Sequence, residues 1–238
     1  MSYPDPLSLW RSALNSYVYK TDLTKSRYKK IYPAYFCCST SDYKSVEHLQ
    51  NRFRHLCSSV PEVWYEVIYW KTLTLGQPDR RINDVHTFLD VSKVFAALKE
   101  FIKEPSPIKF TNFRTALGYK KGSQAFAVPM TFPAFYAPDL FPMVDKYVAK
   151  WVNASLKSVS SIRSDPGPNK LMPFKKVAAK TELNFKDHYC SYIAWVNWCR
   201  RESDILNVKT CEKDWTPRRV EMAVFAATHN PGITLDMA

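Results

Sequence analysis

Glycine is scarce in this chain, with five residues against sixteen prolines among 238. So few glycines favour defined connections between elements over flexible glycine-rich linkers. No apolar run approaches the roughly 20 residues that a membrane-spanning helix needs, and the first residues, MSYPDPLSLW, lack the basic and apolar regions of a secretory signal peptide. We therefore expect a soluble, intracellular protein that is not attached to a membrane, in the cytoplasm, nucleoid or nucleus.

Most of the short motifs that carry catalytic chemistry are also missing. The sequence contains no G-x-G-x-x-G, no P-loop, no H-E-x-x-H and no G-x-S-x-G. None of the six cysteines forms a C-x-x-C pair, and the five histidines do not combine with them at zinc-ligand spacings. We therefore expect reduced thiols, no metal site and no cofactor. A cysteine and a histidine that meet only in space stay possible as a nucleophile pair.

Basic residues are abundant: 34 Lys and Arg stand against 22 Asp and Glu, a formal net charge of +12. A surplus of this size favours a polyanionic partner, either a nucleic acid or an anionic membrane surface. Residues 1–43 hold seven of the fourteen tyrosines, and Lys20, Lys25, Arg27, Lys29 and Lys30 are interleaved with them. This N-terminal arm could stack on bases and neutralise phosphates, or it could pack its rings on the body of the protein.

Apolar residues recur at helical spacing through most of residues 44–238. The pattern predicts a mostly α protein with seven to nine helices, among them residues 45–57, 61–75, 146–153 and 185–201. Asn83 or Asp84 is the expected cap of a helix extending to Ile102, and Thr216 followed by Pro217 the expected start of the last helix. The last helices occupy residues 185–229. A basic connection, residues 155–181, is either a flap against a polyanion or a surface excursion.

The stretch from 110 to 152 carries the strongest functional pattern. A turn, Gly118 to Gly122, separates two helical segments, and the second is expected to begin near Gly122, Ser123 and Gln124. The backbone N–H groups at a helix start, with Lys120 and Lys121 beside them, suit a phosphate. Further along, Asp145 opens the next helix, either as its cap or as a functional carboxylate.

This stretch resembles the helix–hairpin–helix DNA glycosylases, and the MutY-like members most. The phrase FPMVDKYV matches the family's active-site phrase at Phe141, Pro142, Asp145 and Val148, and Ala125 matches the small residue of its DNA-gripping hairpin. Tyr119 and Lys121 stand where that hairpin has glycines, and the iron–sulfur cysteine cluster of some members is absent.

The resemblance implies a two-lobed helical protein that binds double-stranded DNA and cleaves an N-glycosidic bond with the help of Asp145. Ser123 stands where bifunctional members carry their Schiff-base lysine and MutY-like members carry serine, which implies a monofunctional enzyme. Lys120, Lys121, Gly122, Ser123 and Gln124 would contact the DNA backbone. The family also raises weaker candidates for a base pocket (Trp195, Trp198, Trp64, Tyr65), a second acid (Glu66) and an intercalating residue (Gln77).

Two other functions fit the same residues. The chain could be a non-catalytic nucleic-acid-binding module in which Asp145 only caps a helix. It could also be a helical interaction or regulatory protein whose basic surface meets an acidic protein or a membrane.

Overall fold

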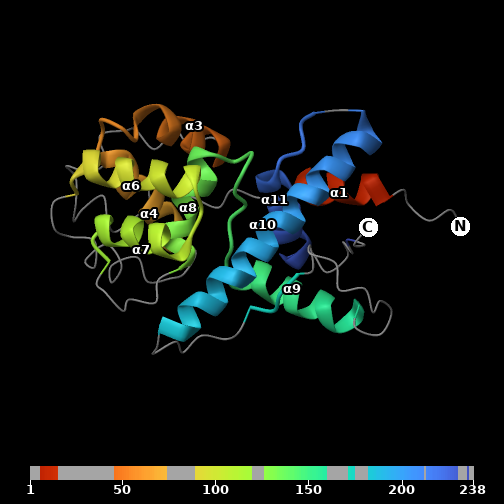
Figure 1. Cartoon of the computed structure of the whole chain (residues 1–238). Helices are drawn as coiled ribbons and strands as arrows, with labels where there is room; N and C mark the ends of the chain where they lie inside the picture. The colour runs from red at the N-terminus through yellow and green to blue at the C-terminus, as the bar shows by residue number, and fades with distance from the viewer. Residues whose placement is uncertain are drawn as a thin grey trace, which may run out of the picture. The chain divides into compact units, whose positions relative to one another are not determined.

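The computed structural model describes residues 6–15, 46–73, 89–119, 126–159, 171–174, 182–211, 213–229 and 235. Within these ranges the chain forms nine α-helices and no strand (Figure 1). The prediction of a mostly α protein with seven to nine helices is therefore confirmed. No described helix combines the length and the apolar character that crossing a bilayer requires.

The chain divides into two compact units. One, here called the central unit, is continuous and covers Tyr19–Tyr136, whereas the terminal unit combines Met1–Val18 with Ala137–Ala238. The helix α1, Pro6–Asn15, thus belongs with the C-terminal half of the sequence. The predicted boundary between residues 43 and 44 lies outside the described residues.

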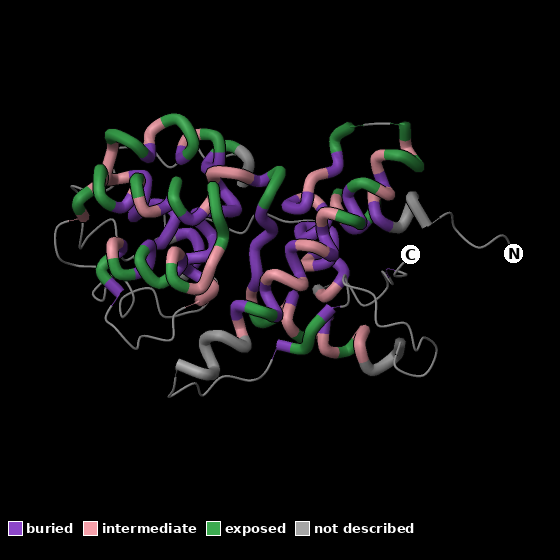
Figure 2. Tube along the Cα trace, in the orientation of Figure 1, coloured by how far each residue is buried: buried purple, intermediate pink, exposed green. Residues whose placement is uncertain are grey.

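The central unit is built around α8, a helix that is buried along almost its whole length (Figure 2). It contacts α3, α4 and α6, and α6 packs on α7. Aromatic rings fill the space between these helices: Phe53 and Trp64 both lie against Phe132 of α8, at centroid distances of 5.6 and 5.0 Å. The helices are α3 (Val46–Leu56), α4 (Glu62–Leu73), α6 (Val91–Lys103), α7 (Pro107–Ala116) and α8 (Ala127–Tyr136).

The terminal unit is centred on α11, which contacts α1, α9 and α10. Three buried alanines on α11 (Ala223, Ala226 and Ala227) leave room for its neighbours. Next to it, five of the seven tryptophans gather in one cluster, in which the Trp195 and Trp198 rings stack with centroids 5.2 Å apart. The helices are α1, α9 (Lys146–Val159), α10 (Glu182–Thr210) and α11 (Pro217–His229); the other members of the cluster are Trp10, Trp151 and Trp215.

Local signals explain where several helices begin. Thr216 Oγ1 accepts a hydrogen bond from the Arg219 amide, with Pro217 as the first helical residue, so the predicted start of the last helix is confirmed. In contrast, α6 is capped by Asp90, whose carboxylate accepts from the Lys93 amide. The predicted cap at Asn83 or Asp84 lies outside the described residues, and a continuous helix from there to Ile102 is wrong because residues 89 and 90 are not helical.

Two helices run further than their apolar pattern predicted. Helix α9 continues to Val159, beyond Asn153, so the first residues of the expected 155–181 connection are helical. Helix α10 spans 29 residues to Thr210, nine beyond Arg201. Its extension contains buried polar residues, Glu202 and Ser203, which interrupt the apolar pattern although the backbone remains helical.

Candidate functional site

Asp145 caps α9 with both its backbone and its side chain. Its carbonyl accepts the first intrahelical bond, from the Ala149 amide, at 2.9 Å. Its Oδ1 accepts from the amides of Tyr147 and Val148, at 2.8 and 2.9 Å. Two N–H groups that the helix cannot pair internally are thereby satisfied, and these two bonds fix the carboxylate in position.

The helix cap does not use the second carboxylate oxygen of Asp145, Oδ2. Among the described residues Oδ2 accepts no hydrogen bond and meets no cation. Asp145 is half-buried, and its charge is favoured by the N-terminal end of the α9 dipole. A rigidly held carboxylate with one uncommitted oxygen has the property needed to orient a water molecule or to stabilise a developing positive charge.

The segment that leads into Asp145 is anchored at four of its carbonyls. Tyr192 Oη donates to the Pro142 carbonyl and Trp195 Nε1 to the Met143 carbonyl, both at 2.9 Å and both buried. Arg200 Nε donates to the Leu140 carbonyl at 3.1 Å, and the Arg218 amide to the Pro138 carbonyl at 3.3 Å. The segment is not a strand, yet side chains of α10 take the place of a neighbouring strand, and residues 141–144, which directly precede Asp145, are buried (Figure 2).

The turn after α7 is a helix-terminating motif. Gly118 has a φ of 86°, and its amide donates to the Thr115 carbonyl while the Tyr119 amide donates to the Arg114 carbonyl. This pair of bonds defines a Schellman motif, in which glycine is favoured because it carries no Cβ. Gly118 therefore has a structural reason to be where it is, independent of any ligand.

The predicted phosphate-binding residues themselves, Lys120, Lys121, Gly122, Ser123 and Gln124, lie outside the described residues. The start of the following helix is described, and it differs from the prediction. Helix α8 begins at Ala127 rather than near Ser123. Its first turn includes Pro129, which has no N–H, and its residues from Val128 onward are buried. The unpaired N–H groups at the start of α8 therefore do not belong to Ser123 and Gln124, as the prediction had them.

The aromatic candidates for a base pocket form the protein interior. Trp64, Trp195 and Trp198 are each at most 2% exposed, and Tyr65 is also buried. The Trp64 Nε1 donates to the Cys57 carbonyl at 2.9 Å, as expected of a buried indole with a structural role. Core packing accounts for all four.

Glu66 is ion-paired, but in the interior. Arg52 Nε donates to Glu66 Oε2 at 3.1 Å and Arg52 Nη2 donates to Oε1 at 3.4 Å, and the Glu66 side chain is 4% exposed. A buried carboxylate requires such a partner, so the pair is part of the packing between α3 and α4. Gln77 lies outside the described residues, and in the described ranges no three His, Cys, Asp or Glu side chains gather as metal ligands would.

One part of the basic 155–181 connection is held in place. Asn153 on α9 pairs with Phe174 in both directions: its Nδ2 donates to the Phe174 carbonyl and its Oδ1 accepts from the Phe174 amide, each at 2.8 Å. Ser191 on α10 donates to the Pro173 carbonyl at 2.9 Å. Residues 171–174 are therefore attached to α9 and α10, whereas the rest of the connection beyond Val159 lies outside the described residues.

Sequence reasoning missed the anchoring residues Tyr192, Trp195 and Arg200. The sequence indicates an apolar helix face at Tyr192 and a base-pocket candidate at Trp195, and it does not mark Arg200, because their polar tips bind carbonyls 50 to 60 residues away in sequence. The available signal was their chemistry: three long side chains with a polar tip on one buried helix need acceptors.

No family model, curated protein or solved structure matches this chain.

Proposed function

We propose that this protein binds double-stranded DNA and removes a base from it, with Asp145 as the catalytic carboxylate. The observation that carries the proposal is the fixed carboxylate with Oδ2 uncommitted among the described residues, at the end of a segment anchored at four carbonyls. The net charge of +12 supports a polyanionic partner, and the FPMVD phrase supports the reaction class.

In the proposed reaction the target nucleotide leaves the stack. The bond between C1′ of its sugar and the base nitrogen breaks, and the electron pair departs with the base. Water adds to C1′ as hydroxyl, and its remaining proton neutralises the departing base. Asp145 Oδ2 orients this water or stabilises the oxocarbenium-like sugar, and the chain needs no metal or cofactor for either role. Lys120 and Lys121 contact the DNA backbone.

A second function is favoured by one specific observation. Oδ1 of Asp145 accepts from both available amides of the α9 start, which is sufficient by itself to explain an aspartate at this position. In this alternative the protein binds nucleic acid without chemistry, and Asp145 is a helix cap alone.

The substitution Asp145→Asn separates the two functions. Asparagine caps a helix about as well as aspartate, so the fold is kept while the charge is removed. We expect abasic-site formation on a panel of damaged and mismatched duplexes to fall by about 100-fold or more in the variant. Asp90→Asn is the matched control, because Asp90 is also a helix-capping aspartate, at the start of α6, and it should leave the rate unchanged.

Absence of abasic sites on the whole panel, together with tight duplex binding by the wild-type chain, would favour the non-catalytic module. Equal rates for Asp145→Asn and the wild-type chain would reject Asp145 as the catalytic group. A wild-type chain that binds no duplex would reject both functions.

A further inference from the structure

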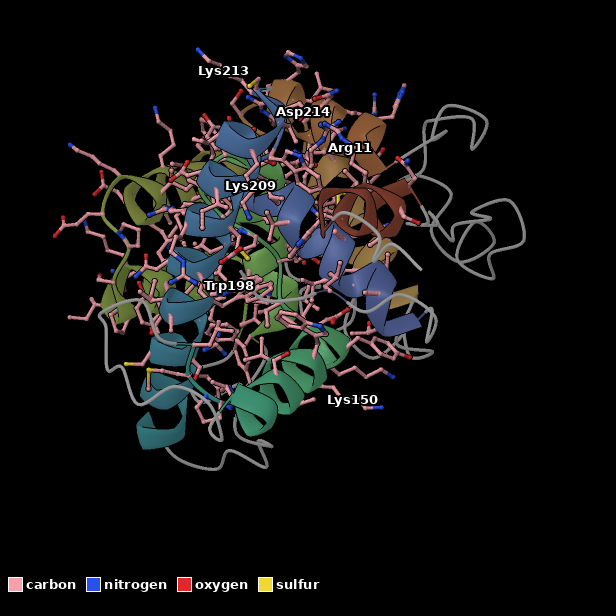
Figure 3. The ribbon with its side chains drawn as sticks, turned by 90° about the vertical axis from the view of Figure 1, so that its right-hand side faces the viewer. Arg11, Lys150, Trp198, Lys209, Lys213 and Asp214 are labelled. Atoms are coloured by element: carbon pink, nitrogen blue, oxygen red, sulfur yellow. The ribbon has the colours of Figure 1, made fainter. Side chains whose placement is uncertain are left out.

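A cluster of cations lies where α10, α11 and α1 meet in the terminal unit. Arg11 comes from α1, Lys209 from the last turn of α10, Lys213 from the connection to α11, and Arg219 from the first turn of α11. Figure 3 labels Arg11, Lys209 and Lys213 around Asp214 at this place. We call these four cations the basic corner. It contains more cations than acids even when Glu212 of the sequence is counted with Asp214.

The two arginines of the basic corner are held by a shared carboxylate. Arg219 Nη1 donates to Asp214 Oδ2 at 2.6 Å and to the Asp214 carbonyl at 2.9 Å. Arg11 Nη1 lies 3.6 Å from the same Oδ2. The three side chains are 37 to 42% exposed, so the arrangement is open to a large partner. A carboxylate between two guanidinium groups fixes their spacing, and the three side chains together still carry a net positive charge.

The residues that support these arginines are themselves held in place by hydrogen bonds and ring contacts. Asn207 Nδ2 donates to the Trp215 carbonyl and Asn207 Oδ1 accepts from the Trp215 amide, each at 2.9 Å. The guanidinium of Arg11 lies over the Trp215 ring, 5.8 Å from its centroid, and the Trp10 ring meets the same indole edge-on. Stacking on an aromatic ring orients a planar guanidinium. Binding through such preorganised groups loses less side-chain entropy than binding through free ones.

The two lysines have no such role in the folded chain. Lys209 and Lys213 are exposed, and neither makes an ion pair with a carboxylate that the structure describes. Exposed lysines beside a rigid pair of arginines are the usual means of contacting a phosphate backbone without reading sequence. An acidic protein or an anionic membrane would present the same sign of charge, but the partner is already proposed to be DNA.

We infer that the basic corner is a second contact site for the sugar–phosphate backbone of duplex DNA, separate from the Lys120–Lys121 turn. The identity of the partner rests on the proposed function, whereas the location of the site rests on Arg11, Lys209, Lys213 and Arg219. Because this site contacts only the sugar–phosphate backbone, which is the same in every duplex, it raises the affinity for all duplex sequences equally.

The test uses the full chain with Lys209 and Lys213 both replaced by alanine. Neither lysine makes an ion pair with a carboxylate among the described residues, and the attraction of Lys209 to Glu202 is the weakest of the influences on that carboxyl, so stability should change little. The slope of log affinity against log salt should become shallower by about 0.9 for each lost phosphate contact, by an equal amount on duplexes of different sequence. Lys93→Ala/Lys103→Ala on α6 is the control: it removes the same charge from exposed positions in the central unit, and its slope should match the wild type.

Three results would overturn the inference. The first is equal loss in the two double variants, which would show only a general charge effect. The second is an unchanged slope in Lys209→Ala/Lys213→Ala while Lys120→Ala/Lys121→Ala weakens binding, which leaves the proposed function intact. The third is binding to phosphatidylserine-containing vesicles that depends on Lys209 and Lys213 while duplex binding does not. Failure of the wild-type chain to bind any duplex removes the proposed function and this site together.

Discussion

Asp145 holds one carboxylate oxygen in a helix cap and presents the other with no partner among the described residues. A structural role and a chemical role are thus combined in one side chain, and the two are separable because they use different atoms. The capping bonds need only an acceptor at Oδ1, whereas electrostatic catalysis needs the negative charge.

The structural role predicts a difference between two substitutions in the free energy of unfolding. Asp145→Ala should lower it by about 1 kcal/mol because both capping bonds are lost, and Asp145→Asn should change it by much less. Chemical denaturation with a fixed m-value measures both. Asp139→Ala, at an exposed position of the same segment, is the control and should stay within about 0.5 kcal/mol of the wild type. A stable Asp145→Ala protein would mean that other contacts fix the start of α9.

The cysteines should differ sharply in reactivity. Burial raises the pKa of the Cys57 thiol to about 11 and that of Cys199 well above its ordinary value, whereas Cys190 and Cys211 are exposed. The thiolate is the reactive form, so brief alkylation at neutral pH should label Cys190 and Cys211 and spare the two buried thiols. Peptide mass mapping measures this, with the denatured chain as the control in which all six cysteines of the sequence, these four included, react. Early labelling of Cys57 would contradict the described core.

Glu202 gives a pH dependence with a definite sign. Burial raises its pKa above the ordinary value, with the Arg201 hydrogen bond acting in the opposite direction. A carboxyl whose pKa is higher in the folded state favours folding when protonated, so stability falls as the pH rises from its unfolded-state pKa through its folded-state pKa. Glu202→Gln should therefore unfold at a higher temperature than the wild type at neutral pH, and this advantage should shrink in acid. Thermal unfolding at several pH values tests it; a constant difference would refute the assignment.

At the scale of elements, α10 organises the terminal unit by holding segments that have no regular structure of their own. It binds the approach to Asp145 through Tyr192 and Trp195, residues 171–174 through Ser191, and the turn before α11 through Asn207. Each bond gives a backbone group of an irregular segment the hydrogen-bond partner that it would otherwise lack. A helix of 29 residues is long enough to serve these separate segments.

Removing one anchor should affect both stability and activity. Tyr192→Phe keeps the ring but leaves the buried Pro142 carbonyl without its donor, which should lower the free energy of unfolding by about 1–3 kcal/mol. If the approach segment positions Asp145, the base-excision rate should fall as well. Asn207→Ala removes bonds that support the basic corner and not Asp145, so it should show a comparable stability loss with an unchanged rate of base excision when the duplex is saturated with protein. Equal effects of the two variants on this rate would assign the loss to general destabilisation.

Sequence periodicity located most helices because it depends on neighbours only one turn apart. It failed where distant packing overrides local pattern. The 202–210 part of α10 was missed because Glu202 and Ser203 are polar yet buried, the first beside Arg201 and the second bonded to the Arg200 carbonyl. The α9 cap was predictable, since Asp145 directly precedes a helical pattern; the anchors of its approach segment were not, because their partners lie 50 to 60 residues away.

At the scale of the whole molecule, α1 packs with the C-terminal helices, and Trp10 meets both Trp198 and Trp215. Nothing in residues 6–15 alone indicates this, because the contact closes a loop of nearly the full chain length. The same closure brings Arg11 to Asp214 and so completes the basic corner. Lys120 and Lys121 fall within the residue range of the central unit, and the basic corner belongs to the terminal unit.

A polyanion that touches both units predicts additive salt effects. Lys120→Ala/Lys121→Ala and Lys209→Ala/Lys213→Ala should each make the slope of log affinity against log salt shallower by about 1.8, since two lysines each release about 0.9 counterions. The variant that carries all four changes should show the sum of the two effects, because each lysine that is removed deletes its own phosphate contact. Fluorescence anisotropy with one labelled duplex over a salt series measures all three, and Lys93→Ala/Lys103→Ala supplies the charge-matched reference. A fourfold variant no worse than either pair would show that one duplex does not contact the two sites at once.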